Sequence, residues 1–162
     1  MKTFAINGAG RIGRLVIREY FRRKPNTVKL AAINDLTDTE TLAYLLEFDS
    51  VHGRFASTVS VNNGGLTIDD VTIPVLSEAQ PQKLPWAKFG IDWVLESSGR
   101  FCLREDAARH LSAGAKKVLI GAPSESADLT VIYGVNHQDY NSRTHQIISS
   151  GSCTTNSLVP PL

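Results

Sequence analysis

The chain has 162 residues, of which 42% are hydrophobic and 20% charged, and its 17 basic and 16 acidic residues leave a net charge of +1 with neutral histidines. This length suits one domain with a sizeable core and is too short for two ordinary domains. The charge balance excludes the strong field of a nucleic-acid or membrane-surface protein, and the apolar runs are too short for a membrane span or a signal peptide. We therefore expect no nucleic acid and no membrane as partners, and a cytoplasmic location.

Short apolar runs alternate with amphipathic stretches along the chain, and turn residues separate them. In chain order, the predicted elements are a strand over Lys2–Asn7, a helix over Arg11–Arg22, a strand over Val28–Asn34, a helix over Thr39–Phe48 with Thr37 or Asp38 as its N-cap, short antiparallel strands between Gly53 and Val75 with a hairpin turn at Asn62-Asn63-Gly64-Gly65, a loop or short turn over Pro81–Gly90, a strand over Ile91–Leu95, a helix over Arg104–Gly114, and strands over Lys117–Ile120, Val131–Tyr133 and Gln146–Ile148. This alternation predicts an α/β fold: a Rossmann-like, doubly wound, mostly parallel sheet with helices on both faces and a short antiparallel insertion.

A glycine motif links the first predicted strand to the first predicted helix. Gly8-Ala9-Gly10-Arg11-Ile12-Gly13 has the form G-x-G-x-x-G, and the next strand ends in Asn34-Asp35, about 20 residues further on. In a dinucleotide site such glycines permit a tight turn, close approach to the pyrophosphate and close packing of the helix. Asp35 would accept hydrogen bonds from ribose hydroxyls and repel a 2′-phosphate, which favours NAD over NADP. The alternative is a glycine-rich turn with a helix-capping acid, and the combined context favours the dinucleotide site.

The second of the two cysteines lies in a polar loop near the end of the chain, "SGSCTTNS" (150–157). Residues 154–158 are predicted to begin a helix, with Ser152 or Cys153 at its N-terminus. The helix dipole there would favour the thiolate, and the free N–H groups would stabilise an oxyanion. The alternative is a packing cysteine, which composition alone favours. Cys102 fits that alternative better, and the spacing of the two cysteines predicts neither a disulfide framework nor a metal site but suits a reduced compartment.

Taken together, these segments resemble the glyceraldehyde-3-phosphate dehydrogenase family along nearly the whole chain. The matching segments are "INGAGRIGR" (6–14), "AINDL" (32–36), "FDSVHGRF" (48–55), "LPWAKFGIDWVLESSG" (84–99), "GAKKVLIGAPS" (114–124), "YGVNHQDY" (133–140) and "SCTTN" (152–156), of which the last is highly specific to that family. The resemblance implies an NAD-binding Rossmann domain over residues 1–150. Residues 151–162 would then form the catalytic-cysteine loop and the start of a helix leading to a catalytic domain outside this chain.

The resemblance also implies a reaction, the NAD-dependent phosphorylating oxidation of glyceraldehyde 3-phosphate to 1,3-bisphosphoglycerate in glycolysis and gluconeogenesis. The Cys153 thiolate would attack the aldehyde, hydride transfer to NAD would leave a thioester, and inorganic phosphate would release the acyl phosphate. The family positions imply roles for Ser152 and Thr154 in binding that phosphate. The implied cofactor-binding residues are Gly8, Gly10, Arg11, Ile12 and Gly13 at the pyrophosphate, Asn34 and Asp35 toward the adenosine ribose, and Ser98 and Gly99 near the nicotinamide ribose.

Departures from the family pattern concern the cofactor site and the end of the chain. Gly121 replaces a serine that touches the cofactor in relatives, Ala79 replaces an arginine near the adenine, and Gly151 and Ser157 replace an alanine and a second cysteine. The resemblance implies a second half that this sequence does not include. That half would supply the general-base histidine, the ligands of the substrate phosphate and most contacts of the expected homotetramer. The histidines present are His52 in a structural motif, His110 in an amphipathic helix, His137 in a surface turn and His145 before a strand, and none matches the base.

Three functions follow from these observations. The first is a dehydrogenase represented by its cofactor half and its nucleophile, with erythrose 4-phosphate as the alternative substrate. The second is an isolated NAD-binding module without turnover, and the third is a thiol sensor based on an exposed reactive cysteine. Because the chain stops at Pro160-Pro161-Leu162 inside an expected helix, we expect the stop to be arbitrary, and we expect the piece to bind NAD weakly without dehydrogenase activity.

Overall fold

A computed structural model describes residues 1–62 and 64–161 of the chain. Its helices and strands are β1 (Lys2–Asn7), α1 (Arg11–Arg23), β2 (Val28–Asn34), α2 (Thr39–Glu47), β3 (Phe48–Asp49), β4 (Gly53–Arg54), β5 (Val59–Asn62), β6 (Gly65–Ile68), β7 (Val71–Leu76), the 3-10 helix η1 (Pro81–Lys83), α3 (Trp86–Phe89), β8 (Trp93–Glu96), α4 (Arg104–Ser112), β9 (Lys117–Ile120), β10 (Leu129–Thr130), the 3-10 helix η2 (His137–Asp139), β11 (Ile147–Ser149) and α5 (Cys153–Leu158). The predicted alternation of strands and helices is confirmed.

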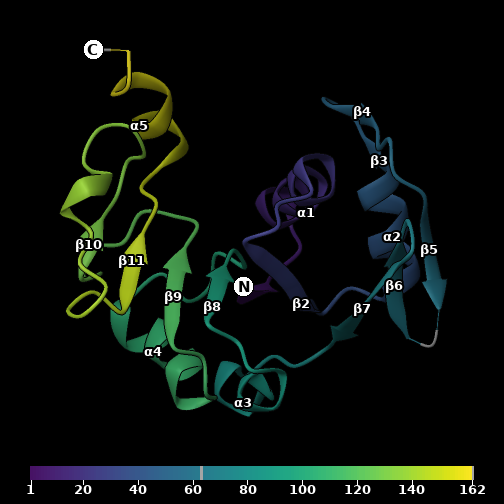
Figure 1. Cartoon of the computed structure of the whole chain (residues 1–162), viewed down its shortest axis with the longest axis horizontal. Coiled ribbons are helices and arrows are strands. Elements are labelled where there is room, and N and C mark those ends of the chain that lie inside the picture. Colours follow the sequence, from purple (N-terminus) through teal and green to yellow (C-terminus); the bar gives the residue numbers. More distant parts are fainter. Residues whose placement is uncertain (63, 162) are drawn as a thin grey trace.

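The main sheet has nine strands in the order β10-β11-β9-β8-β1-β2-β7-β6-β5. The strands from β10 to β7 pair in parallel, whereas β6 and β5 continue the sheet in antiparallel pairing. From the central β1 the chain moves to β2 on one side and later returns to β8 on the other. The β1/β8 boundary is therefore the switch point at which open α/β sheets bind ligands beyond the carboxyl ends of their strands. Figure 1 shows α5 beyond β11, at the edge toward which the arrows of β8, β9 and β11 point.

Helices cover both faces of this sheet, as predicted. Side chains alternate along β1, so that Ile6 packs with Ile17 and Phe21 of α1 on one face, whereas Ala5 packs with Trp86 of α3 on the other. Helix α1 buries residues 13, 17 and 21, which lie four positions apart on one side of the helix. Each large apolar side chain buried in this way contributes roughly 1.5–3 kcal/mol to the free energy of folding.

Two predicted strands at the end of the chain differ from the structure. The strand predicted over Val131–Tyr133 is wrong, because the strand is β10, which ends at Thr130. Asn136 draws the chain into a turn instead: its side-chain oxygen accepts from Ile132 N–H at 2.7 Å, and its amide donates to Thr130 C=O at 2.9 Å. The strand predicted over Gln146–Ile148 is β11, which lies one residue further along the chain.

Other predicted bounds need smaller corrections. The strand predicted from Ile91 begins at Trp93, and the helix predicted to reach Gly114 ends at Ser112, with Gly114 in the left-handed region just beyond it. The N-cap of α2 is Asp38, whose carboxylate accepts from Thr41 N–H at 2.8 Å. Asn63 of the predicted hairpin turn lies outside the described residues, and β5 and β6 on either side of it pair antiparallel.

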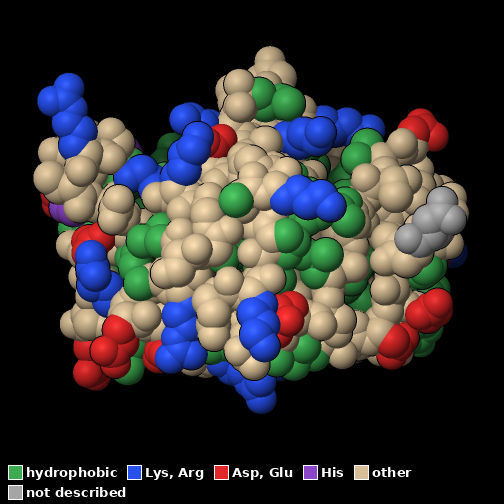
Figure 2. All heavy atoms as spheres, turned by 90° about the horizontal axis from the view of Figure 1, so that it is seen from below, with side chains coloured by type: hydrophobic (Ala, Val, Ile, Leu, Met, Phe, Trp, Pro, Cys, Tyr) green, Lys and Arg blue, Asp and Glu red, His purple; other side chains and the backbone are tan. Residues whose placement is uncertain are grey.

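Charged side chains of both signs are interspersed on the face of the molecule shown in Figure 2, in keeping with the nearly equal numbers of basic and acidic residues. The exposed surface of this face therefore has no single sign of charge that would dominate the attraction of a ligand.

Among residues 1–62 and 64–161, the helices are all too short or too polar to cross a bilayer.

Asp92, directly before β8, links the amino ends of three neighbouring strands, β8, β9 and β1. Its carboxylate accepts from Lys116 Nζ at 2.8 Å, just before β9, and from Thr3 N–H of β1 at 2.9 Å. The hydrogen bond with Lys116 and that with the Thr3 backbone lower the pKa of Asp92 to about 2. Because the folded-state pKa lies below that of the unfolded chain, the stabilisation is present above about pH 4 and is lost as the pH falls toward 2.

Asp92→Asn is expected to lower the free energy of unfolding at pH 7 by about 1–2 kcal/mol, a range that allows for solvent screening of the exposed Lys116. Urea unfolding of the variant and the parent chain at pH 7 and at pH 3 measures the difference, which is expected to shrink at the lower pH. Asp70→Asn, at an exposed site, serves as the matched control. An equal difference at both pH values would contradict the ionic origin of the effect.

Candidate active site at the carboxyl edge of the sheet

The turn between β1 and α1 is shaped by three glycines with different surroundings. Gly8 has φ +90°, and a Cβ atom there would lie 2.4 Å from the backbone nitrogen of Ser98. A Cβ atom on Gly13 would lie 2.2 Å from the carbonyl oxygen of Gly8, whereas one on Gly10 would meet no heavy atom within 4 Å. The first and third glycines are therefore required by the packing of the protein itself, and Gly10 faces open space that a ligand can occupy.

Helix α1 begins at this turn, directly after Gly10. Gly10 is the N-cap residue and has no side chain to accept from the N–H groups of Arg11 and Ile12, and the first turn carries no acidic residue. Such a helix start binds anions, because its free N–H groups and its dipole both favour negative charge. The glycine spacing predicts a dinucleotide pyrophosphate at this helix start.

Asp35, just beyond β2, touches the glycine turn directly. One carboxylate oxygen accepts from Ala9 N–H at 2.6 Å and the other from Thr37 N–H at 2.8 Å. Each oxygen keeps a further lone pair for a ligand hydroxyl. The carboxylate lies at the wall of a cleft of about 210 Å³, which is lined by Asn7, Gly8, Gly10, Asn34, Asp35, Leu36, Glu78, Ala79, Ser97, Ser98, Arg100 and Phe101.

The cleft brings together most of the residues predicted to bind the cofactor. Gly8, Gly10, Asn34, Asp35 and Ser98 all line it. The remaining predicted cofactor residues are adjacent in the chain: Arg11, Ile12 and Gly13 open α1, and Gly99 follows Ser98 with φ +75°. Ala79 also lines the cleft.

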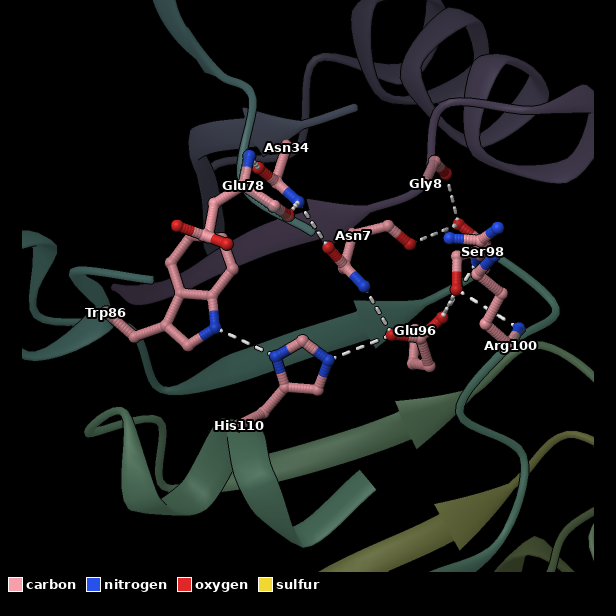
Figure 3. Close-up of polar contacts among 10 residues, drawn as sticks. Asn7, Gly8, Asn34, Glu78, Trp86, Glu96, Ser98, Arg100 and His110 are labelled. Atoms are coloured by element: carbon pink, nitrogen blue, oxygen red, sulfur yellow. Dashed lines mark hydrogen bonds and ion pairs between the residues drawn. The ribbon is translucent and has the colours of Figure 1, made fainter. Parts of the chain in front are cut away.

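Sequence analysis missed a buried polar network beneath this cleft, drawn in Figure 3. Glu96, the last residue of β8, is 1% exposed and accepts hydrogen bonds from Asn7, Ser98 and the fully buried His110. His110 in turn accepts from the indole N–H of Trp86 at 2.9 Å. The one sequence signal for this network is an acidic residue at the end of an otherwise apolar strand, "WVLE".

Cys153 is the first residue of α5, as predicted, and it is exposed. Ser152 is the N-cap: its hydroxyl oxygen accepts from Thr155 N–H at 3.0 Å and lies 2.8 Å from the hydroxyl oxygen of Thr154. Asn156 fixes the loop by donating to the carbonyl oxygens of Ser150 and Ser152. Ser152 and Thr154 precede and follow the exposed Cys153 in sequence, and their hydroxyl oxygens lie close to each other.

The two cysteines differ in environment. Cys102 is partly buried, and burial, together with the nearby charge of Glu96, raises the pKa of its thiol. Because the thiolate is the reactive form, this raised pKa lowers the reactivity of Cys102. Among the described residues, no cluster of three or more histidine, cysteine or acidic side chains is arranged to hold a metal ion.

The four histidines have partners of their own. His52 contacts the Asp49 carboxylate at 3.1 Å, His137 accepts from Gly134 N–H, and His145 accepts from Asn141 N–H. His110, which sequence analysis assigned only to an amphipathic helix, is fully buried against Glu96. These contacts give each ring a local structural role.

The chain is similar in sequence to known proteins along nearly its whole length. The family profile described as "Glyceraldehyde 3-phosphate dehydrogenase, NAD binding domain" matches residues 2–104. The glyceraldehyde-3-phosphate dehydrogenase of Geobacillus stearothermophilus is 50% identical over 155 residues, which are 96% of this chain and 46% of that protein. That of Thermotoga maritima is 51% identical over 160 residues, 99% of this chain and 48% of that protein. The chain therefore spans about half the length of the curated relatives it matches.

Proposed function

Because the chain belongs to the glyceraldehyde-3-phosphate dehydrogenase family, we propose that it is the cofactor-binding part of a phosphorylating aldehyde dehydrogenase and carries its nucleophile. The cofactor of this domain is NAD. The observation that carries the proposal is the open glycine turn at the β1/β8 switch point, with the Asp35 carboxylate beside it. Cys153 begins α5, and Figure 1 shows α5 beyond β11 at the same edge of the sheet.

The chemistry follows from an exposed thiol whose two sequence neighbours, Ser152 and Thr154, carry hydroxyl groups. The Cys153 thiolate attacks the aldehyde carbon of glyceraldehyde 3-phosphate and forms a hemithioacetal on its sulfur. NAD, when bound, supplies the hydride acceptor for the oxidation of this adduct to a thioester. Ser152 and Thr154 hydrogen-bond inorganic phosphate, whose attack on the thioester carbon frees the Cys153 sulfur and yields 1,3-bisphosphoglycerate.

The division of labour follows the two predicted segments. Residues 1–150 form the NAD-binding domain, and residues 151–162 form the catalytic-cysteine loop and the start of the next helix. The general base and the ligands of the substrate phosphate belong to a further part of the protein. The full-length protein assembles as a homotetramer. Without that part, the 162-residue chain binds NAD but loses the roughly 10²–10⁴-fold contribution of a positioned base, and it shows no steady turnover.

Two measurements on the 162-residue chain test this proposal. Calorimetric titration with NAD is expected to show binding, and a mixture with glyceraldehyde 3-phosphate, NAD and phosphate is expected to show no steady rise in NADH absorbance. Erythrose 4-phosphate forms the parallel substrate arm. Failure to bind NAD would overturn the assignment of the cleft. Turnover that persists in the triple variant His52→Ala, His137→Ala, His145→Ala but is lost in Cys153→Ser would overturn the proposal that the general base lies outside the 162 residues.

Asp35→Asn is expected to weaken NAD binding about tenfold, because the charge-assisted hydrogen bonds to the ribose hydroxyls are lost. The same change removes the carboxylate that repels a 2′-phosphate, so the ratio of the NADP and NAD dissociation constants is expected to fall. Calorimetry with both dinucleotides measures these constants. Asp38→Asn is the matched control, since asparagine is an equally good N-cap for α2. An unchanged ratio in Asp35→Asn would contradict the role of the carboxylate.

A further inference from the structure

Glu96 lies beneath the NAD cleft and is bonded to both of its walls (Figure 3). From this arrangement we infer that Glu96 is a positioning residue: its carboxylate holds the two walls of the cleft in register for the cofactor. The inference rests on the NAD site of the proposed function and extends it to residues outside the cofactor-binding motif.

The first wall is formed by the ends of β1 and β2 and the segment after β7. The backbone of Glu78 fixes the orientation of the Asn34 amide, because Glu78 N–H donates to Asn34 Oδ1 and Asn34 Nδ2 donates to Glu78 C=O, both at 2.9 Å. Asn34 Nδ2 also donates to Asn7 Oδ1 at 2.7 Å. Asn7 must therefore direct its amide N–H group at Glu96 Oε2, which it reaches at 2.5 Å.

The second wall is the loop that follows β8. Ser98 donates both its backbone N–H and its hydroxyl to Glu96 Oε1, at 2.8 Å and 2.5 Å. The Ser98 hydroxyl oxygen accepts from Arg100 N–H at 3.2 Å, so the carboxylate also orders the next turn of the loop. Both Ser98 and Arg100 line the cleft.

A third set of contacts anchors the carboxylate from the core. An indole nitrogen can only donate, so Trp86 Nε1–H requires His110 Nδ1 to be the acceptor. The proton of the neutral ring is then on Nε2, which donates to Glu96 Oε2 at 2.8 Å. Trp86 and His110 are both fully buried, and they lie on α3 and α4, away from the glycine turn.

The directions of these hydrogen bonds require a carboxylate at position 96. Asn7 and His110 present fixed donors to one oxygen, and the Ser98 backbone presents a fixed donor to the other. A carboxylate accepts at both oxygens, whereas the amide of glutamine would place an N–H₂ group against donors on one side. A buried donor left without an acceptor is costly, so such a change must displace one wall of the cleft or the anchor.

Glu96→Gln is therefore expected to raise the NAD dissociation constant at least tenfold, measured by calorimetry on the 162-residue chain, with a circular-dichroism spectrum like that of the parent. Glu105→Gln, on the exposed side of α4, is the matched control and is expected to bind NAD like the parent chain. An NAD dissociation constant within twofold of the parent value in Glu96→Gln would overturn the inference. Failure of the parent chain itself to bind NAD would instead overturn the proposed function.

Trp86→Phe provides a second test that does not alter the carboxylate. It removes the donor to His110 Nδ1, whereas Glu96 still accepts from Nε2–H. The proton is therefore expected to stay on Nε2, and the loss of one anchor of the ring is expected to raise the NAD dissociation constant about threefold or more. Trp93→Phe, on β8 but outside the network, is the matched control. Equal NAD affinity in the two tryptophan variants would overturn the inference even where Glu96→Gln fails to fold.

Discussion

Gly8→Ala is expected to destabilise the chain by about 3 kcal/mol or more and to abolish NAD binding. The backbone at this position has φ +90°, which side chains rarely adopt, and the added methyl carbon would lie 2.4 Å from Ser98 N and 2.5 Å from Ser98 Cα. Neither contact is with a flexible side chain, so the turn or the loop after β8 must shift as a unit. Urea unfolding and calorimetry with NAD measure the two effects.

Gly10→Ala tests whether the glycine at this position is needed for NAD binding but not for folding. No heavy atom lies within 4 Å of a Cβ atom at this position, so the variant is expected to unfold at nearly the urea concentration of the parent chain. The methyl group nevertheless occupies the space beside the N-terminus of α1, and we expect NAD affinity to fall by about tenfold or more. Parent-like affinity in Gly10→Ala would show that the pyrophosphate does not approach the turn there.

Cys153→Ser in the full-length protein is expected to lower the rate of NADH formation at least 10⁴-fold, because a serine hydroxyl without a dedicated base is a poor nucleophile. NAD affinity of the variant is expected to stay near that of the parent, since position 153 lies outside the residues that line the cleft. NADH absorbance in the presence of glyceraldehyde 3-phosphate and phosphate gives the rate, and calorimetry gives the affinity.

Cys102→Ser is the control for this change, and its activity is expected to remain within a few-fold of the parent. Cys153 is exposed, whereas Cys102 is partly buried and burial raises the pKa of its thiol, so alkylation of the parent chain is also expected to modify Cys153 first. Mass spectrometry of peptides identifies the modified site.

Retention of more than about 1% of the parent activity in Cys153→Ser would contradict the nucleophilic role of Cys153.

The parts of the fold that sequence analysis predicted well depend on neighbours in the chain. Lys2–Asn7, Val28–Asn34 and Lys117–Ile120 have the predicted bounds, because a buried parallel strand is a continuous apolar run ended by polar or glycine residues. The glycine turn was likewise recognisable, since its spacing is local. The strand predicted over Val131–Tyr133 was wrong because the side chain of Asn136 competes for its backbone groups, which the apolar pattern does not reveal.

The parts of the site that sequence analysis missed depend on residues far apart in the chain. Glu96 meets Asn7 across two paired strands and His110 across a strand and a helix. No period or spacing connects these positions, because their proximity is a product of the sheet order. A histidine in an amphipathic helix and an acid at the end of a strand each have an ordinary interpretation alone, and only the fold joins them in one network.

The position of β1 in the sheet also determines when, during protein synthesis, the cofactor site can first exist. Phe4 of β1 pairs with Leu30 of β2 and with Trp93 of β8, so one partner is made soon after β1 and the other much later. Contacts between distant segments form only after the intervening chain has been closed into a loop. The backbone of Ser98 completes the surroundings of Gly8. A ribosome-bound chain that ends before this residue therefore lacks one wall of the cleft, although its glycine motif was translated first.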